Sequence, residues 1–332
     1  MDKQNSILKA ESLSIGYHKA GRKKVVAENL NFHLEKGKLT CLLGPNGVGK
    51  STLIKTIMGQ IPAIQGNITL LEKPLREYSL HEISKKISVV LTEKVSTGSL
   101  TVRQLVELGR IPHTGWLGQL RQQDKEKVEK AIEATNIQYL SECHLSELSD
   151  GQLQKAMIAR ALAQDGEILI LDEPTAHLDL VNRLEIMHLL KKLAKKAHKA
   201  ILITTHDLEV AIETADVFWL MQCGIPLVIG IPEDLIIRNQ MNVLLPGKGL
   251  AFDALSGKII QKDQKNSVNI EGPQIPVIWI KAALAKKGFS KHLKDLHILV
   301  TEEPFAIQLI GNQQTKIFYS IESLIDFLEG AN

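Results

Sequence analysis

The sequence has few cysteines, few aromatic residues and no long apolar run. Phe, Trp and Tyr make up 4% of the 332 residues, and the three cysteines (Cys41, Cys143 and Cys223) lie far apart. Such spacing argues against a disulfide framework and against a zinc site, and it fits a reducing cytoplasm. No apolar run approaches the roughly 20 residues that cross a bilayer. The first residues also lack the basic start and apolar stretch of a signal peptide. We therefore expect any contact with a membrane to be made through partners.

The chain also lacks a strong charge of either sign. It contains 40 basic and 37 acidic residues, which gives a formal net charge of +3. That excess is too small to indicate binding to nucleic acid. The hydrophobic content of 44% and the charged content of 23% are those of an ordinary soluble globular protein. The length fits about two domains.

The most informative stretch is rich in glycine and ends in a lysine and two hydroxyl residues. It reads Gly44-Pro45-Asn46-Gly47-Val48-Gly49-Lys50-Ser51-Thr52 and matches the P-loop pattern in full. A buried strand is predicted before it (38–43) and a helix after it (51–58). Glycines let backbone N–H groups surround the phosphates of a nucleotide at the start of that helix. Lys50 would reach the β- and γ-phosphates, and Ser51 would hold Mg²⁺. The sequence therefore predicts a nucleotide site.

Two further apolar strands end in groups suited to hydrolysis. Residues 168–174 run into Asp172 and Glu173, and residues 200–206 end at His206. Open α/β sheets collect such groups at the carboxyl ends of their parallel strands, so we expect them to meet Lys50. Asp172 would hold Mg²⁺, and Glu173 would act as general base on the attacking water. A lone histidine at a strand end is often structural, but this context favours a contact of His206 with the γ-phosphate.

The remaining pattern predicts two additions to the sheet. Residues 11–43 alternate like paired antiparallel strands, and residues 101–163 are mostly helical, which indicates a helical insert within a β/α domain. Tyr17 precedes a polar loop at 18–24. Its position fits equally an adenine-stacking ring and an ordinary tyrosine at a strand end.

Together these motifs resemble the ATP-binding subunits of ABC transporters over about residues 6–240. Besides the P-loop, the resemblance rests on Leu148-Ser149-Asp150-Gly151-Gln152 as signature motif, Leu171-Asp172-Glu173-Pro174 as Walker B, Ala176-His177-Leu178-Asp179 as D-loop and His206 as switch histidine. The resemblance implies an α/β fold, a P-loop NTPase core with an antiparallel β subdomain and a helical subdomain at about 98–163. It also implies that the chain is an ATPase.

The resemblance further implies a head-to-tail homodimer. Ser149 and Gly151 of one copy would close over ATP on the P-loop of the other, with Gln152 and Asp179 as further nucleotide contacts. Ser149 begins a helix, and a helix N-terminus favours anions, which agrees with that role. Tyr17 then takes the role of the adenine-stacking residue. The implied cofactors are ATP and Mg²⁺.

Two segments narrow the resemblance further. Residues 101–113 and 175–179 look like the corresponding segments of importers for iron–siderophore, haem and cobalamin. This implies transmembrane permease subunits as partners and, indirectly, a substrate-binding protein, with no role for nucleic acid. The chain would lie peripherally on the cytoplasmic face of the inner (plasma) membrane.

The chain departs from the family pattern at two places. Asp150 stands where the signature usually has glycine, and we expect its carboxylate to point away from the phosphate and to bond the helix N-terminus. Thr92-Glu93 stands where the family supplies a glutamine that contacts Mg²⁺ and senses the membrane subunits. Thr92 is the favoured replacement as metal ligand through its hydroxyl, while Glu93, or neither residue, remains an alternative.

The tail predicts a second domain. We place the ATPase domain at 1–250 and a small α+β domain at 251–332, with strand–helix–strand–strand–strand–helix order and no catalytic motif. This domain either stabilises packing and dimerisation or regulates the ATPase by sensing a ligand. Trp279 lies in its first helix, where core packing is expected.

Two other functions compete with an importer subunit. A soluble ABC-type ATPase that acts in protein assembly, on DNA or on ribosomes is disfavoured, because the chain has no coiled-coil insertion, no second ATPase domain and little net charge. A nucleotide sensor without activity is disfavoured because it needs neither Glu173 nor His206.

Overall fold

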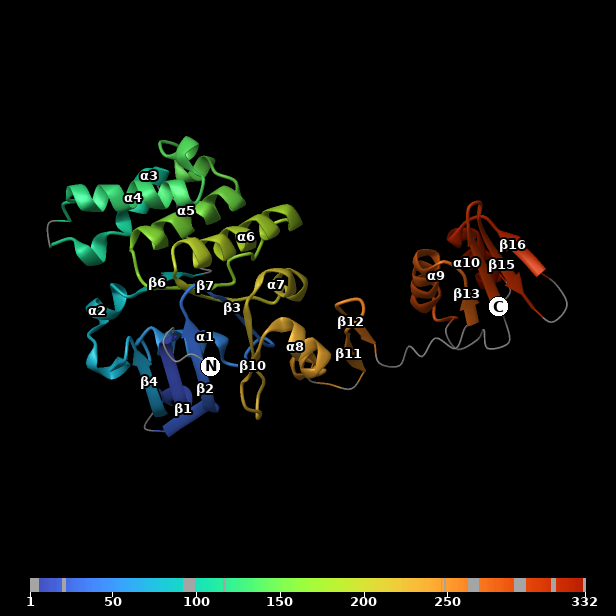
Figure 1. The fold of residues 1–332 in the computed structure, drawn as a ribbon, viewed down its shortest axis with the longest axis horizontal. Helices are drawn as coiled ribbons and strands as arrows, with labels where there is room; N and C mark the ends of the chain where they lie inside the picture. The colour runs from blue at the N-terminus through green and yellow to red at the C-terminus, as the bar shows by residue number, and fades with distance from the viewer. Residues whose placement is uncertain are drawn as a thin grey trace. The chain divides into compact units, whose positions relative to one another are not determined.

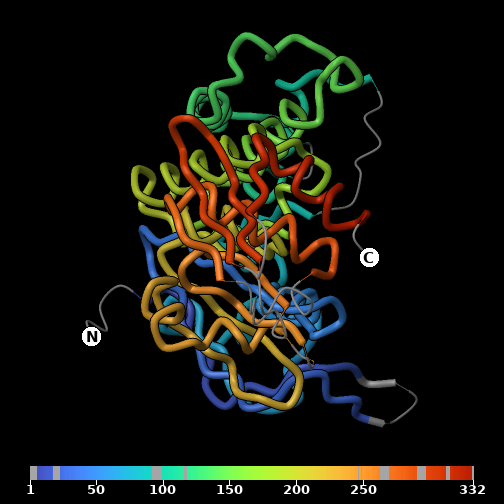
Figure 2. The backbone as a smooth tube through the Cα atoms, turned by 90° about the vertical axis from the view of Figure 1, so that its right-hand side faces the viewer, coloured from blue at the N-terminus to red at the C-terminus, as the bar shows by residue number. Residues whose placement is uncertain are grey.

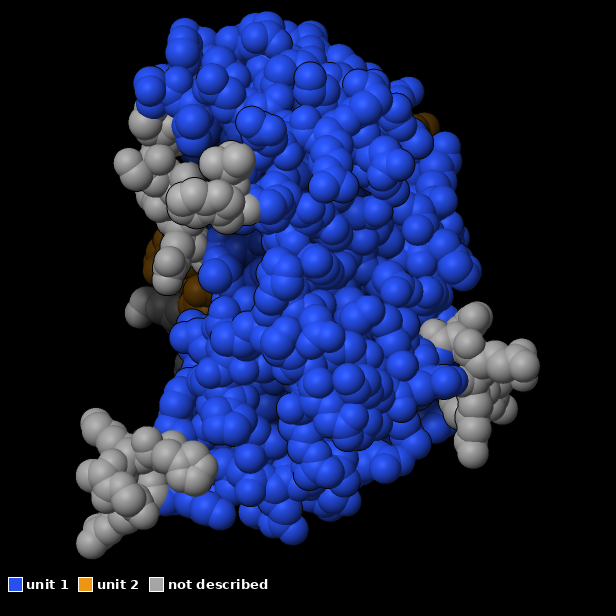
Figure 3. All heavy atoms as spheres, turned by 90° about the vertical axis from the view of Figure 1, so that its left-hand side faces the viewer, with its two compact units in different colours: residues 1–246, 254–258 blue, residues 247–253, 259–332 orange. Residues whose placement is uncertain are grey.

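The computed structural model describes residues 6–19, 22–91, 99–115, 118–245, 247, 249–261, 269–289, 297–311 and 315–330. The chain divides into two compact units. Unit 1 contains residues 1–246 and 254–258, and unit 2 contains residues 247–253 and 259–332. Figure 3 shows unit 1 from one side as a continuous body. Within the described ranges, none of the helices combines the length and apolar content needed to cross a bilayer.

Unit 1 is built on a six-stranded sheet in the order β10-β9-β3-β8-β7-β6 (Figure 1). All neighbours pair in parallel except β10 with β9. Its strands are β3 (Leu39–Leu43), β6 (Ile87–Val90), β7 (Ile168–Asp172), β8 (Ala200–Thr204), β9 (Val217–Leu220) and β10 (Val228–Gly230). Every residue of β3 and β8 is buried, which explains their uninterrupted apolar sequences.

Within the described residues, five α-helices belong to this core. They are α1 (Lys50–Ile57), α2 (Leu80–Ser84), α6 (Leu180–Lys196), α7 (Leu208–Thr214) and α8 (Pro232–Ile237). The predicted helix after the P-loop is therefore confirmed as α1. Helix α6 follows the carboxylate strand, with five leucine, isoleucine and methionine side chains and Ala194 buried on its inner face.

A four-stranded antiparallel sheet forms the second layer of unit 1, in the order β2-β1-β4-β5. Its strands are β1 (Ser6–Lys19), β2 (Arg22–Glu35), β4 (Gln65–Leu70) and β5 (Lys73–Pro74). Leu30, Phe32 and Leu34 alternate along β2 and are all buried, in agreement with the alternation predicted for residues 11–43. The ring of Phe32 lies 4.5 Å from that of Trp219 on β9, so both sheets share one core.

The helical insert contains α3 (Val102–Leu108), α4 (Gln122–Ala134) and α5 (Asp150–Ala163). Figures 1 and 2 show these helices at the end of unit 1 opposite the antiparallel sheet. A buried ion pair holds the insert together, because the Arg110 guanidinium donates to Asp124 at 2.9 Å and to the carbonyl of Ala163 at 2.7 Å.

Unit 2 has the predicted element order. Its elements are β13 (Asn269–Glu271), α9 (Gln274–Lys286), β14 (His297–Glu302), β15 (Phe305–Ile310), β16 (Thr315–Phe318) and α10 (Ile321–Gly330). The strands form one sheet in the order β13-β14-β15-β16. β13 and β14 pair in parallel, and the other pairs are antiparallel. Two short strands, β11 (Leu250–Asp253) and β12 (Lys258–Gln261), pair before this sheet and were not predicted.

The prediction for Trp279 is wrong. Its side chain is 61% exposed, whereas Ile280 and Leu284 face the core of unit 2. Helix α9 carries apolar residues on several faces, so its sequence does not show which face is buried. Residues on the same helix face recur at intervals of three or four, and Trp279 is not on the face of Ile280.

Candidate nucleotide site

The P-loop forms a tight turn between β3 and α1. Gly49 adopts φ +115° at the start of α1, a left-handed conformation that favours glycine. A Cβ on Gly44 would lie 2.4 Å from the carbonyl oxygen of Met221, so only glycine fits there. The N-terminus of α1 receives no hydrogen bond from a capping side chain. Its first backbone N–H groups therefore suit an anion such as phosphate.

Lys50 lies in this turn. Its ammonium donates to the carbonyl of Gly44 at 2.7 Å and to that of Pro45 at 3.2 Å. Burial lowers the pKa of Lys50, and the charges of Glu173 and Asp172 oppose that shift. Both carboxylates thus lie near enough to Lys50 to act on its charge. Triphosphate oxygens would offer the ammonium stronger, charge-assisted partners than the two carbonyls.

The structure also brings His206 to the carboxylates. Asp172 ends β7, and Glu173 follows it with φ +48°. The His206 imidazole Nδ1 lies 3.6 Å from the carboxylate oxygen Oε1 of Glu173. Lys50, Asp172, Glu173 and His206 thus lie together at the carboxyl ends of the strands, as the sheet topology requires.

Sequence reasoning missed Thr204, the last residue of β8. Its hydroxyl lies 2.5 Å from Asp172 Oδ1 and accepts a hydrogen bond from the backbone N–H of Glu173 at 2.9 Å. The side chain is fully buried. In the sequence, the only sign of this role was a hydroxyl residue near the end of the apolar stretch 200–206. Threonine is common in strands, so this signal is weak.

Tyr17 reaches the same region from β1. Its phenol oxygen lies 2.8 Å from the hydroxyl of Thr52 in α1, and its side chain is 41% exposed. The hydrogen bond fixes the phenol beside the P-loop helix and leaves part of the ring open to solvent. An adenine base stacked on that ring would carry its phosphates toward the same helix.

The signature motif and the D-loop meet elsewhere on the chain. Ser149 caps the N-terminus of α5, where its hydroxyl accepts from the N–H of Gln152 and Gln152 Oε1 accepts from the N–H of Ser149. Gly151 lies against Asn182, whose side-chain amide donates to Asp179 at 2.7 Å. The structure gives the capping contact of α5 to Ser149 and leaves Asp150 exposed in the first turn. The site residues thus form two groups, one around Lys50 and one around Gly151.

Comparison with known proteins assigns both parts of the chain. The ABC transporter family matches residues 27–176, and the iron ABC transporter C-terminal domain family matches residues 264–329. An uncharacterised ABC transporter ATP-binding protein of Methanocaldococcus jannaschii is 39% identical over 251 residues, which are 76% of this chain and 85% of the relative.

The chain belongs to the ATP-binding proteins of ABC transporters.

Two further proteins resemble this ABC transporter ATP-binding protein. The iron(3+)-hydroxamate import ATP-binding protein FhuC of Bacillus subtilis is 40% identical over 204 residues, which are 61% of this chain and 74% of the relative. The solved structure of cbiO1 from Clostridium perfringens, part of the ABC transporter complex cbiONQ, has a TM-score of 0.63 and 30% identity. That match covers 73% of this chain and 96% of cbiO1. The α/β P-loop fold and the ATPase class expected from the sequence are confirmed.

The donor atoms of this ABC ATPase fit Mg²⁺. Mg²⁺ prefers oxygen ligands, and it is usually held by one or two protein groups together with substrate phosphates and water. Ser51 and Asp172 offer a hydroxyl and a carboxylate of that kind. Within the described residues, no cluster of three or more His, Cys, Asp or Glu residues could hold a metal by itself. Thr92 and Glu93 lie outside the described residues.

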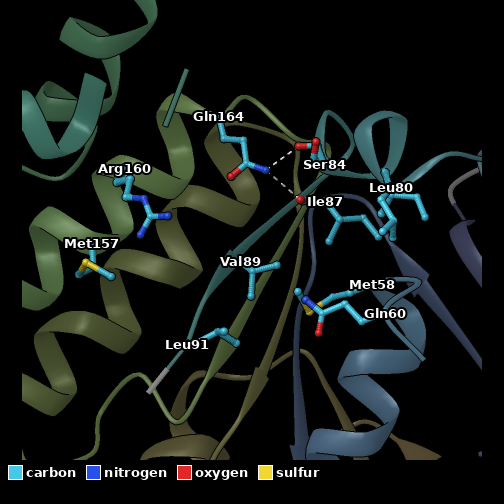
Figure 4. Close-up of a pocket in the computed structure, with 11 residues that line it drawn as sticks. Met58, Gln60, Leu80, Ser84, Ile87, Val89, Leu91, Met157, Arg160 and Gln164 are labelled. Carbon is cyan, nitrogen blue, oxygen red and sulfur yellow. Dashed lines mark hydrogen bonds between the residues drawn. The ribbon is translucent and has the colours of Figure 1, made fainter. Parts of the chain in front are cut away.

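The ABC ATPase unit also contains a groove of about 450 Å³ between its core and its helical insert. Figure 4 shows its lining side chains, which come from the turn after α1, from α2, from β6 with Leu91, and from α5 with the residue that ends it, Gln164. Its apolar lining residues include Leu80, Leu91 and Met157, and Arg160 and Gln164 add polar groups. Gln164 donates to the carbonyls of Ser84 and Ile87 at 2.5 and 3.1 Å, which connects α5 to the core. None of the predicted nucleotide-binding residues lines this groove.

Proposed function

We propose that the protein is the ATPase subunit of an importer for an iron–siderophore complex or a related haem or cobalamin-like cargo. The observation that carries this proposal is the match of unit 2 to the iron ABC transporter C-terminal domain. The iron(3+)-hydroxamate import relative, which is 40% identical over 204 residues, also supports it. The alternative of a soluble ATPase in assembly or nucleic-acid processes gains no support from either comparison.

Hydrolysis would use the group around Lys50. The ammonium of Lys50 and the backbone N–H groups of residues 46–52 would bind the phosphates, and the Ser51 hydroxyl and the Asp172 carboxylate would hold Mg²⁺. The metal, when bound, would neutralise charge on the phosphates. Glu173 would accept a proton from the attacking water, and His206 beside it would hold that water toward the γ-phosphate. Thr92 stays a predicted third metal ligand.

The group around Gly151 would act on a second copy. In a head-to-tail homodimer, Ser149, Gly151 and Gln152 would close over ATP held by the P-loop of the partner, with Asp179 beside them. The contacts around Gly151 are separate from those around Lys50, which supports this division. Tyr17 would stack on the adenine. Hydrolysis would then separate the two copies and drive the alternating access of the membrane subunits.

The groove between the core and the helical insert is the proposed docking site for the permease. Leu80 is 63% and Leu91 43% exposed, which is unusual for large apolar side chains that surround a concave surface. Leu91 immediately precedes Thr92, where the family places its sensor of the membrane subunits. An amphipathic cytoplasmic helix of the permease would place apolar side chains in this groove.

The ATPase domain would span residues 1–250 and the accessory domain residues 251–332. The protein would lie peripherally on the cytoplasmic face of the inner membrane. A substrate-binding protein would act indirectly, through the permease.

One purification tests this assembly. The tagged chain is isolated from native membranes in mild detergent, and a polytopic membrane protein is expected in about one-to-one ratio. Leu80→Asp, which places a charge in the groove, should abolish recovery of that partner without reducing the ATPase activity of the isolated chain. Ile237→Asp is the control, because Ile237 is 77% exposed on α8 outside the groove. Recovery from cytosol alone, in iron-poor and iron-rich cells, would contradict the importer.

A second assay tests the assignment of the base. Glu173→Gln keeps the size of the side chain but cannot accept the proton of water. We expect ATP turnover to fall by about two orders of magnitude or more while ATP binding is retained. Undiminished turnover would exclude Glu173 as the general base. A parent chain without turnover would instead support a nucleotide sensor.

A further inference from the structure

The hydroxyl of Thr204 lies between the two acidic residues of the hydrolytic site. Thr204 and Asp172 are opposite each other on the parallel neighbours β8 and β7. Thr204 Oγ1 lies 2.5 Å from Asp172 Oδ1 and 2.9 Å from the backbone nitrogen of Glu173. The threonine side chain is fully buried. One side-chain atom therefore contacts both acidic residues.

The chemistry of the partners fixes the direction of the hydroxyl proton. A threonine hydroxyl has one proton to donate and two lone pairs to accept with. The N–H of Glu173 can only donate, and an ionised carboxylate can only accept. The proton of Thr204 therefore points to Asp172, which makes the short contact a charge-assisted hydrogen bond. This bond holds one oxygen of Asp172 in a defined direction.

The same hydroxyl helps to hold an unfavourable backbone conformation. Glu173 has φ +48°, in the left-handed region that residues with a Cβ adopt at an energetic cost. Its N–H donates to the carbonyl of Thr204 at 3.1 Å as well as to the hydroxyl. The conformation of Glu173 determines where its side chain points. Thr204 thus acts on the direction of both carboxylates.

We propose that Thr204 is a positioning residue for ATP hydrolysis. Its hydroxyl directs the Asp172 carboxylate toward Mg²⁺ and holds the Glu173 backbone so that the base faces the attacking water. This inference rests on the proposed roles of Asp172 and Glu173. Thr204 acts through these two residues.

Two substitutions separate the hydroxyl from the rest of the side chain. Thr204→Val keeps the shape and removes the hydroxyl, while Thr204→Ser keeps the hydroxyl and removes the methyl group. In the full-length chain we expect Thr204→Val to lower kcat for ATP about 10- to 100-fold, as loss of a charge-assisted hydrogen bond does, with a much smaller change in KM. Thr204→Ser should stay within about threefold of the parent chain if the hydroxyl alone matters.

A binding measurement provides a readout that does not depend on turnover. Affinity for the non-hydrolysable analogue AMP-PNP is measured with and without Mg²⁺. In the parent chain and in Thr204→Ser, Mg²⁺ should strengthen binding, and in Thr204→Val that gain should shrink several-fold while metal-free affinity stays unchanged. Thr135→Val is the stability control, because Thr135 is a buried threonine of the helical insert whose hydroxyl donates to Ala131 and Ile132.

The results of these measurements decide separately on the role of Thr204 and on the proposed ATPase function. If Thr204→Val retains kcat within twofold and keeps the full Mg²⁺ gain, Thr204 is not a positioning residue. If Thr204→Ser loses as much as Thr204→Val, keeping the hydroxyl is not enough to retain activity, and the proposal that the hydroxyl positions the two carboxylates is wrong. If Glu173→Gln abolishes turnover while Thr204→Val does not, the proposed function stands and only this inference fails. If the parent chain lacks turnover, the Mg²⁺ gain still decides the role of Thr204.

Discussion

Asn182 lies directly against Gly151, and this contact connects the signature motif to the D-loop within one chain. A Cβ added to Gly151 would lie 2.6 Å from Oδ1 of Asn182. The same Asn182 donates to both carboxylate oxygens of Asp179, from its backbone N–H at 2.8 Å and from its side-chain amide at 2.7 Å. Any side chain at position 151 therefore has to displace Asn182. That displacement would disturb the N-terminal cap of α6.

We predict that Gly151→Ala lowers ATPase activity by about tenfold or more, equivalent to a loss of about 1.4 kcal/mol in transition-state stabilisation. Affinity for ATP at low protein concentration should change little, because the P-loop is untouched. Steady-state kinetics and nucleotide titration of the same samples measure the two quantities.

Asn182→Ala offers the matched test of that mechanism. It removes the group that the new methyl would meet, so Gly151→Ala/Asn182→Ala should be about as active as Asn182→Ala alone. If the losses of ATPase activity in the two single variants instead add up in the double variant, the contact between the new methyl group and Asn182 is not the cause.

The hydrogen bond between Tyr17 and Thr52 leads to a second prediction. If the ring stacks on adenine, Tyr17→Ala should weaken ATP binding by roughly 5- to 100-fold, since a base stacked on an aromatic side chain contributes about 1–3 kcal/mol. Tyr17→Phe keeps the ring and loses only the 2.8 Å contact to Thr52. It should stay within about threefold of the parent chain, because that contact is partly exposed to water. Equal losses in both variants would assign the effect to the hydroxyl instead of the ring.

Much of this site was readable from the sequence because its motifs are local. The P-loop glycines and the carboxylates after an apolar strand each report on a few consecutive residues. The order of elements in unit 2 followed from apolar periodicity in the same way. These predictions needed no knowledge of which distant residues meet.

The missed features have different causes, and one of them is a contact between distant segments. Thr204 matters because the register of β7 and β8 places it opposite Asp172, and nothing in residues 200–206 alone records that register. The face of α9 that carries Trp279 was assigned wrongly because the helix is apolar on several sides. The cap expected from Asp150 is supplied by the adjacent Ser149.

The corrected orientation of α9 can be tested on neighbouring residues. Ile280 is fully buried and Trp279 is 61% exposed. Ile280→Ala should therefore destabilise unit 2 by about 2–5 kcal/mol through loss of core packing. Trp279→Ala, although it removes a larger side chain, should cost less than about 1 kcal/mol. Hydrogen exchange of the β14 and β15 amides in the full-length chain reports on unit 2 specifically. A larger cost for Trp279→Ala would mean that its exposed ring is covered in solution.

The buried pair Arg110–Asp124 predicts how the helical insert responds to acid. Burial raises the pKa of Asp124, but the N–H of Arg121 and the Arg110 guanidinium outweigh it and hold the pKa below its ordinary value. A carboxyl whose pKa is lowered in the folded state stabilises the fold above its unfolded pKa of about 4, and this contribution disappears as the pH falls through the folded pKa.

Asp124→Asn should cost about 3–5 kcal/mol at neutral pH, because it leaves Arg110 buried without its charged partner. Urea unfolding of both chains should show this difference shrinking as the pH falls below about 4. Glu142→Gln is the control, since that carboxylate is 79% exposed in its pair with Arg103 and should contribute less than about 1 kcal/mol. A cost of Asp124→Asn that stays constant with pH would show that packing of the side chain, and not its charge, stabilises the insert.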